Sequence, residues 1–449
     1  MWRAGVKSPA FSFILICLFM LLAHFTVGQN KVLIDYESAL KIVESEDVSD
    51  AVVAIIDGGV MSSHPDIVGS IWQNQDEIVN NIDDDGNGLI DDVIGWNFNN
   101  NTDDISIGGL GNWHGTPVNG IINSLTNGSG YVTTMLLNVV KGEKISSVVE
   151  SLNYLYHERK KYNESNGKEG AFIVAVNCSW GKDSLWAFDY PEWCSLYDSL
   201  GHEGVLVVSS VPNSNINIDE FGDMPSTCGS DYLITVTNTN KNDEKVGEAG
   251  YGKETVDIAA PGENSYTLLN TGRYGYFGGT SAAAPYVTSA IRLLYSLPSK
   301  GFHDDVQKKP DKVAGLIKRC IMEGSDKIAS LKEITVSGGR LNVFNSIKLL
   351  CDYYGEQYLY KDIFKPLEIV SVYPNPATTS TTLVVESDQF KSATIGLVDS
   401  NGRYVKSFGT ELSDGINSIS IDFNETPKGF YVLRIASGSS LKTRKVFIQ

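Results

Sequence analysis

The sequence predicts an α/β domain with a central parallel sheet, followed by a small all-β sandwich. Three observations support this prediction: short continuous apolar runs in the first part of the chain, helical patterns between them, and alternating apolar and polar residues in the last part. Strands of a parallel sheet are buried on both faces and are therefore apolar throughout, whereas strands of a sandwich alternate. A chain of 449 residues is long enough for both domains.

The predicted parallel sheet rests on four apolar runs, each bounded by turn residues: 51–56, 171–176, 204–208 and 232–236. Helical patterns separate some of these runs, at residues 144–161 and 190–202. Alternation of strands and helices is typical of an α/β domain, and functional residues in such domains gather at the carboxyl ends of the strands. We therefore expect one such domain over residues 51–352.

The alternating pattern covers residues 369–449, where turn dipeptides such as Asn401-Gly402 recur at short intervals. No long helical pattern appears in this part of the sequence. These features predict an all-β sandwich of about seven strands. Residues 353–368 form the expected linker between the two domains.

The N-terminus has the features of a secretory signal peptide over residues 1–28. Arg3 and Lys7 precede an apolar run from Phe11 to Ala23, and small and polar residues follow. A membrane anchor is the alternative, but the run is shorter than the roughly 20 residues that a span needs. We therefore expect a mature protein without a transmembrane span, which begins with a short segment, residues 29–50.

The overall composition limits the classes of molecule that the protein is expected to bind. The apolar fraction of 42% and the charged fraction of 20% are ordinary for a globular protein. The net charge of -18 and the isoelectric point near 4.8 argue against a nucleic-acid or acidic-lipid partner. Both values fit a soluble, exported protein.

Export also permits disulfides, and five cysteines follow the predicted signal peptide. An odd number leaves at least one thiol unpaired within the chain. Our pairing hypothesis joins Cys194 to Cys228 and Cys320 to Cys351, although sequence alone leaves other pairings open. Cys178 would then be free. It lies in a strand-like run, which favours a buried structural thiol over a nucleophile.

A candidate nucleophile stands at the start of a predicted helix. Ser281 follows the glycine pair at 278–279 and precedes a run of alanines, so it is either a helix cap or a nucleophile. His114 lies just before another helical pattern, and Asp57 closes the first apolar run. A serine hydroxyl needs an imidazole to take its proton, and the imidazole needs a carboxylate to hold its tautomer. Together the three residues favour the nucleophile.

These residues lie in three motifs: Asp57-Gly58-Gly59 followed by His64-Pro65-Asp66, then His114-Gly115-Thr116-Pro117, and Gly279-Thr280-Ser281-Ala282-Ala283-Ala284-Pro285. On these motifs, about residues 50–350 resemble the subtilisin-like serine peptidases, the subtilases, which share the order Asp, His, Ser. The resemblance implies a subtilisin-like three-layer fold and a secreted serine endopeptidase that hydrolyses peptide bonds through an acyl-enzyme. Ser281 would be the nucleophile, His114 the general base and Asp57 the orienting carboxylate.

The resemblance also implies residues that bind the oxyanion and the substrate. Asn213 aligns with the asparagine that donates to the oxyanion, although Pro-Asn is also a turn dipeptide. Ser179, Trp180 and Gly181 resemble the strand that pairs with the substrate backbone and borders the pocket for its side chain. We expect both roles in this chain.

Four positions depart from the pattern of the subtilases: Pro117, Pro212, Ala282 and Tyr286. None of these departures removes a catalytic group. Pro212, however, restricts the backbone beside the oxyanion position. The alternative is therefore a catalytically weak or inactive homologue that acts as a peptide-binding or surface-adhesion protein.

An acidic loop predicts a calcium ion with a structural role. Oxygen-bearing side chains lie at positions 1, 3, 5 and 9 of a loop similar to an EF-hand, at Asp83, Asp85, Asn87 and Asp91. Hard oxygen ligands at alternating positions around a glycine turn suit Ca²⁺. Ile94 stands where an EF-hand has its bidentate glutamate, so a solvated acidic turn is the alternative.

The tail carries Tyr373-Pro374-Asn375-Pro376 at its start and ends in a strand-like stretch, residues 444–449. On these features, residues 369–449 resemble the type A C-terminal sorting domain of the type IX secretion system of Bacteroidetes-like bacteria. The resemblance implies that this secretion machinery is a partner, besides peptide or protein substrates. It also implies a secreted or outer-membrane surface location in a Gram-negative bacterium. A carbohydrate- or protein-binding sandwich is the alternative.

Overall fold

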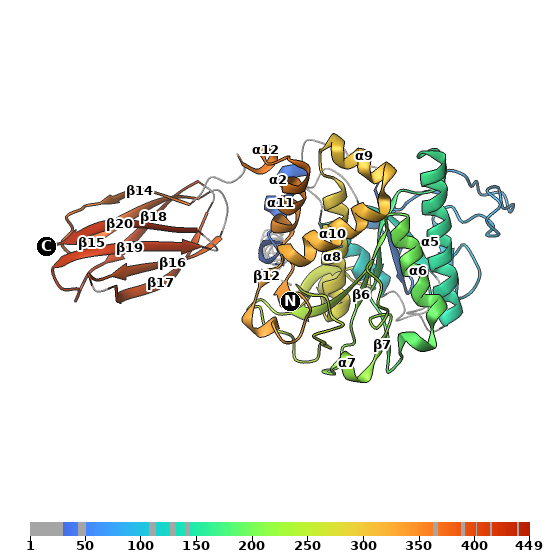
Figure 1. The fold of residues 1–449 in the computed structure, drawn as a ribbon, viewed down its shortest axis with the longest axis horizontal. Coiled ribbons are helices and arrows are strands. Elements are labelled where there is room, and N and C mark those ends of the chain that lie inside the picture. Colours follow the sequence, from blue (N-terminus) through green and yellow to red (C-terminus); the bar gives the residue numbers. More distant parts are fainter. Residues whose placement is uncertain are drawn as a thin grey trace, which may run out of the picture. The chain divides into compact units, whose positions relative to one another are not determined.

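The computed structural model describes residues 30–43, 51–106, 114–125, 132–139, 144–361, 367–387, 391–400, 402–413, 415–437 and 440–449. The predicted signal peptide and part of the expected linker lie outside the described residues. The chain divides into two compact units, Met1–Glu356 and Gln357–Gln449, and each is described by itself (Figure 1).

The first unit is built on a nine-stranded sheet among the described residues, in the spatial order β12-β13-β9-β8-β6-β4-β1-β3-β2. Neighbouring strands run parallel except for the antiparallel pair β12 and β13. The strands are β1 (Val52–Asp57), β2 (Gly95–Asn97), β3 (Thr133–Asn138), β4 (Ile173–Cys178), β6 (Leu206–Ser210), β8 (Leu233–Thr239), β9 (Ile258–Pro261), β12 (Asp326–Lys327) and β13 (Gly339–Arg340). Four of them, β1, β4, β6 and β8, fall on the predicted apolar runs, so the predicted parallel sheet is confirmed.

The other elements of the first unit are helices and two short strand pairs. The helices are α2 (Tyr36–Val43), α3 (Pro65–Val68), α4 (Gly115–Ser124), α5 (Ile145–Ser165), η1 (Ala187–Asp189), α6 (Pro191–His202), α7 (Ile218–Phe221), α8 (Thr280–Tyr295), α9 (Lys300–Lys308), α10 (Pro310–Gly324), η2 (Ala329–Leu331) and α11 (Val343–Tyr354). The antiparallel pairs are β5 (Lys182–Asp183) with β7 (Asp223–Met224), and β10 (Ser265–Leu268) with β11 (Tyr274–Phe277). Helices α5 and α6 match the two predicted helical patterns.

Helices cover both faces of the sheet, as the packing of β1 shows. Val52 and Ile56 pack in one apolar cluster with residues of α5 and α6, whereas Val53 and Ile55 pack in a second cluster with residues of α4. Successive residues of a strand point to opposite faces, so both faces of β1 are buried. Figure 1 shows α5 and α6 together on one side of the strands and α8 on the other. This is the expected three-layer arrangement.

The second unit is a sandwich of two antiparallel sheets. One sheet has the order β14-β15-β18 and the other β17-β16-β19-β20. Apolar residues from both sheets, such as Val385 of β15 and Ile395 of β16, share one buried cluster. The predicted all-β sandwich is therefore confirmed. The elements are α12 (Tyr358–Lys361), β14 (Glu368–Tyr373), β15 (Ser380–Ser387), β16 (Lys391–Val398), β17 (Tyr404–Leu412), β18 (Gly415–Asp422), β19 (Gly429–Ser437) and β20 (Ser440–Ile448).

The segment before β1 packs into the first unit. The side-chain amide of Asn30 is buried and donates to the hydroxyls of Ser265 in β10 and Tyr286 in α8, over 3.1 and 3.2 Å. The hydroxyl of Tyr36 donates to the carbonyl of Leu125 at the end of α4, over 2.7 Å. Residues 30–43 are thus tied to the helix that carries Ser281 and to the hairpin before it.

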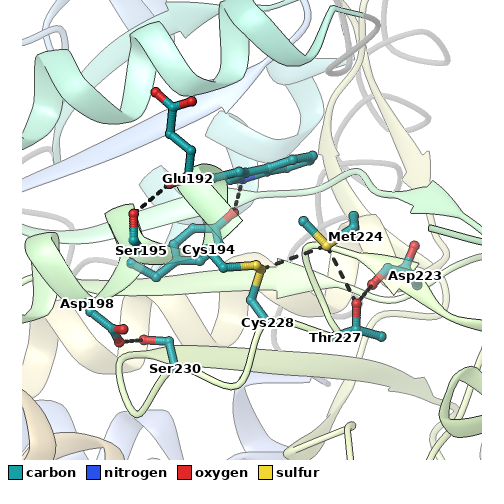
Figure 2. Close-up of a disulfide and its surroundings, with 11 residues drawn as sticks. Glu192, Cys194, Ser195, Asp198, Asp223, Met224, Thr227, Cys228 and Ser230 are labelled. Atoms are coloured by element: carbon teal, nitrogen blue, oxygen red, sulfur yellow. Dashed lines mark hydrogen bonds between the residues drawn. A yellow bond between two sulfur atoms is a disulfide. The ribbon is translucent and has the colours of Figure 1, made fainter. Parts of the chain in front are cut away.

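The cysteines confirm one predicted pairing and contradict the other. Cys194 of α6 forms a disulfide with Cys228, which closes the turn after β7 (Figure 2). Cys320 and Cys351 are free, buried thiols, so their expected pairing is wrong. They pack between α10 and α11 as small apolar side chains, and burial raises the pKa of each thiol to about 12. Cys178 is free and buried, as expected.

Candidate active site

The three predicted catalytic residues lie at the ends of elements that the sheet positions. Asp57 is the last residue of β1, His114 directly precedes α4, and Ser281 lies in the first turn of α8. The Nδ1 atom of His114 lies 2.8 Å from Oδ1 of Asp57. Asp57 is fully buried, and the side chain of His114 is 16% exposed. The pair therefore has the geometry in which a carboxylate fixes the tautomer of an imidazole.

Ser281 makes its hydrogen bond to a different neighbour. Its hydroxyl donates to the carbonyl of Ser179 over 3.0 Å, and the hydroxyl of Ser179 donates to the carbonyl of Ser281 over 3.0 Å. Within the described residues, no hydrogen bond joins Ser281 to His114. Catalytic hydrogen bonds are often long or poorly aligned in structures without substrate and tighten when the substrate binds.

Asn213 lies against the backbone that precedes Ser281. Its Oδ1 accepts from the backbone N–H of Thr280 over 2.9 Å and from the Thr280 hydroxyl over 3.2 Å. A Cβ on Gly279 would lie only 2.7 Å from this oxygen, and Gly279 has φ of +82°, so glycine is required at this contact. Within the described residues, the Nδ2 group of Asn213 donates to no partner, so it can donate to a ligand.

The predicted substrate segment contacts the candidate nucleophile, but its three residues differ in placement. Ser179 contacts Ser281, as described, and Gly181 is half-buried. The Trp180 indole is buried; it donates to the carbonyl of Ile56 over 2.7 Å and packs against Trp193. Any contact of Trp180 with a substrate would therefore come from its backbone.

Sequence reasoning missed an aromatic neighbour of the imidazole. The ring of Phe277, the last residue of β11, meets the ring of His114 edge to face, with centroids 5.5 Å apart. This contact limits the rotation of the His114 ring. Its only sequence signal is the position of Phe277, four residues before Ser281.

The four predicted calcium ligands have different environments. The carboxylate of Asp83 accepts from the backbone N–H groups of residues 86–88, and the carboxylate of Asp91 accepts from those of residues 80–81. Asn87 donates through its amide to the carboxylates of Asp85 and Asp92. Of the four, only Asp85 belongs to the carboxylate cluster that the structure forms.

That cluster joins Asp85 to Glu77 and Asp92, and one oxygen from each lies within 4.8 Å of the others. Glu77 is 4% exposed, Asp92 is fully buried, and the Asp85 side chain is 1% exposed. Oε2 of Glu77 has no hydrogen-bond partner among the described residues. Burial and the charges of the other two carboxylates raise the pKa of Asp92. Three buried hard oxygen donors, one of them orphaned, fit a Ca²⁺ ion.

Two of these cluster residues were not selected from the sequence. Asp92 directly follows Asp91. The spacing of the loop predicts Asp91 as a calcium ligand and gives no reason to choose Asp92 instead. Glu77 precedes the acidic loop and belongs to no motif. It joins the cluster because the acidic loop folds back over it, and its Oε1 atom accepts from the backbone N–H groups of Asp84 and Asp85.

The chain belongs to the Subtilase family, which it matches over residues 49–331. Residues 371–449 match the secretion system C-terminal sorting domain. This membership supports serine-type peptidase activity, and the sorting domain implies export through the type IX secretion system. Among the described residues, every helix is too short or too polar to cross a membrane.

Several characterised proteins are similar to this chain. It is 26% identical to subtilisin-like protease 1 of Plasmodium berghei over 349 residues, which cover 70% of this chain and 52% of that protein. It is 26% identical to thermitase of Thermoactinomyces vulgaris over 284 residues, which cover 60% of this chain and 83% of thermitase. The chain spans about half the length of the first curated relatives that it matches.

A solved structure with a similar arrangement is that of the epidermin leader peptide processing serine protease from Staphylococcus aureus. The TM-score is 0.48 at 20% sequence identity, and the match covers 68% of this chain and 77% of that chain.

Proposed function

We propose that this protein is a secreted serine endopeptidase with Asp57, His114 and Ser281 as its catalytic residues. The observation that carries the proposal is the 2.8 Å contact between His114 Nδ1 and Asp57 Oδ1. The candidate nucleophile, Ser281, lies in the first turn of α8. Such a pair leaves Nε2 of His114 as the base that a serine nucleophile needs.

In this proposal, the Ser281 hydroxyl turns from the Ser179 carbonyl to Nε2 of His114 and loses its proton as it attacks the peptide carbonyl. The backbone N–H of Ser281, which lacks an intrahelical acceptor in the first turn, and the Nδ2 group of Asn213 donate to the developing oxyanion. His114 then protonates the leaving amine, and water hydrolyses the acyl-enzyme by the same steps. The substrate backbone lies along residues 179–181.

Export and a structural calcium ion complete the proposal. The signal peptide and the C-terminal sorting domain would take the enzyme to the cell surface or the medium of a Gram-negative bacterium. Glu77, Asp85 and Asp92 would hold Ca²⁺, whose two positive charges would add to that of Lys161, which pairs with Asp85 over 3.9 Å. The ion would stabilise the fold and take no part in bond cleavage.

A second candidate is a peptide-binding homologue without catalysis. The hydrogen bond from the Ser281 hydroxyl to Ser179, in place of one to His114, favours it. In that case the tripeptide at residues 179–181 would bind an extended peptide. Ser281 is not the cap of α8, whose N-cap is Gly279, and its hydroxyl would serve only to tie α8 to Ser179.

A fluorophosphonate probe separates the two candidates, because it labels a serine only when a base activates it. We expect labelling of the wild-type protein and hydrolysis of a peptide library, and loss of both in Ser281→Ala. Ser289→Ala is the matched control, since Ser289 lies on the same helix and its hydroxyl has no partner among the described residues. A folded wild-type protein that takes no label would support the binding homologue.

A further inference from the structure

Asp223 is a buried carboxylate that the proposed mechanism does not use, and it lies beside the predicted substrate segment. β7, which begins with Asp223, pairs with β5, which directly follows Gly181. A Cβ on Gly181 would lie 2.8 Å from Oδ1 of Asp223 and 3.2 Å from Oδ2. Gly181 ends the tripeptide whose Ser179 carbonyl accepts from the Ser281 hydroxyl. The carboxylate thus lies directly against the segment that contacts the candidate nucleophile.

The Asp223 carboxylate is buried, and one of its two oxygens has no partner within the part of the chain that the structure describes. The residue is fully buried, and Oδ2 accepts from the hydroxyl of Ser226. Oδ1 has no hydrogen-bond partner among the described residues, and no cation forms an ion pair with this carboxylate there. Burial raises the pKa of Asp223 well above the ordinary value, and the nearby Asp183 raises it further. A buried carboxylate with an open oxygen is costly unless a donor or a cation reaches it.

The turn that carries Asp223 is fixed to the rest of the domain. The backbone N–H and the hydroxyl of Thr227 both donate to the Asp223 carbonyl, over 2.9 and 3.0 Å. The Cys194–Cys228 disulfide then ties the end of this turn to α6, as Figure 2 shows. The carboxylate therefore has little freedom to turn toward solvent, which is the property of a preorganised binding group.

We propose that Asp223 selects substrates with a lysine or arginine side chain at the residue whose carbonyl is cleaved. The proposal rests on the proposed function, because that function places the substrate backbone along residues 179–181. A long cationic side chain that passes Gly181 would donate to the open Oδ1 atom of Asp223 and supply the missing positive charge. Glycine at 181 is then required, because any side chain there would block the contact.

A purely structural role is the competing explanation. Asp223 could remain protonated and serve only to organise the turn at residues 223–227, as its hydrogen bonds with Ser226 and Thr227 allow. Such a role predicts no dependence of binding or hydrolysis on the charge of the substrate side chain. The experiment must therefore vary that charge at constant shape.

Two peptides that differ only in arginine or citrulline at the cleaved residue meet this requirement, because citrulline has the shape of arginine without its charge. We expect wild-type kcat/KM to favour the arginine peptide by at least about tenfold, since a site with a buried polar group rejects an analogue that leaves it unpaired. Asp223→Asn should bring the ratio close to one through a loss of arginine-peptide hydrolysis. Asp183→Asn, at the exposed residue that pairs with Asp223, should keep the preference.

Binding to the Ser281→Ala protein tests the same preference without catalysis and without a change at Asp223. We expect it to bind the arginine peptide at least about tenfold more tightly than the citrulline peptide. If the wild type hydrolyses nothing but this preference is present, the endopeptidase proposal fails and the role of Asp223 stands. Equal hydrolysis or equal binding of the two peptides, or binding of neither, overturns the role of Asp223.

Discussion

Ser281 and Ser179 exchange two hydrogen bonds, in which each hydroxyl donates to the carbonyl of the other residue over 3.0 Å. The pair joins the first turn of α8 to the segment after β4. The side-chain amide of Asn177, in β4, donates to the Ser179 hydroxyl over 2.9 Å and so fixes its orientation. The candidate nucleophile is therefore held in register with the substrate segment by the sheet itself.

Replacement of Ser179 by alanine should weaken both stability and turnover. The substitution leaves the buried amide of Asn177 and the Ser281 carbonyl without the Ser179 hydroxyl, which should lower the free energy of unfolding by about 1–3 kcal/mol. The rate constant kcat should fall more than KM rises, because the position of Ser281 changes. Denaturant unfolding and steady-state kinetics measure both effects. Ser209→Ala is the control, since in the described part of the chain the hydroxyl of this buried serine makes only a long 3.4 Å contact with the Ser210 carbonyl. Equal effects of the two substitutions would contradict the prediction.

Asp57→Asn should leave the fold intact and reduce kcat by about 10⁴-fold, because an amide favours the wrong imidazole tautomer. The rate of labelling by the fluorophosphonate probe should fall in parallel, while the melting temperature should change little. Asp66→Asn provides a matched control at an exposed aspartate, whose carboxylate accepts from the Tyr274 hydroxyl. Undiminished labelling of Asp57→Asn would show that another residue orients His114.

Asn213→Ala tests the oxyanion site. Loss of one oxyanion donor should lower kcat by roughly 10²–10³-fold with little change in KM. Asn215→Ala removes an exposed asparagine two residues away, which accepts from the Lys245 ammonium, and should retain activity. A loss confined to KM would point instead to a role of Asn213 in ground-state binding.

Removal of calcium should lower the melting temperature of the wild type. At a free concentration about a hundredfold above Kd, a bound ion stabilises a protein by about 2.7 kcal/mol. Glu77→Gln should weaken the response to the chelator EGTA, measured by differential scanning calorimetry. Asp84→Asn, which changes an exposed carboxylate outside the cluster, should keep the full response. Identical melting temperatures of the wild type with calcium and with chelator would exclude a structural ion at this site.

Stability of the calcium-free protein should fall as the pH rises from about 4.5 to 7. Burial raises the pKa of Glu158 from 4.5 to about 7, so the folded state holds a proton that the unfolded state has released. The unfolded state binds fewer protons in this window, and the free energy of unfolding therefore decreases with pH until both states are ionised. Glu158→Gln should be more stable than wild type by roughly 1–3 kcal/mol at pH 8 and similar to it at pH 4.5. Chemical unfolding at both pH values, in EGTA, checks this; an equal difference at the two values would refute it.

Much of the fold could be predicted from the sequence because the relevant signals are local. The apolar runs marked β1, β4, β6 and β8, and the motif residues Asp57 and His114 lie where strand end and helix start bring them together. Residues that come together only when distant segments of the chain fold against one another carry no such local signal. Glu77 joins Asp85 only after the chain folds back, and Asp223 meets Gly181 only through the pairing of β5 with β7.

The disulfides show the same limit. Cys194–Cys228 and Cys320–Cys351 were equally compatible with the spacing of the cysteines, yet only the first pair forms. Bridge formation depends on the direction in which each Cβ points, and sequence separation carries no such information. In α10 and α11 both thiols are apolar packing residues.

The docking of residues 30–43 has a consequence for recombinant production. A protein trimmed to begin at Ala51 would retain all three sequence motifs that contain the candidate catalytic residues. It would lack Asn30, which links Ser265 to Tyr286, and Tyr36, which holds the end of α4. Trimming would also remove the buried apolar side chains of α2, such as Leu40, and would uncover the parts of α8 and α11 that α2 contacts. The shortest useful peptidase fragment therefore starts at or before residue 30, and a purification tag belongs upstream of it with a flexible spacer.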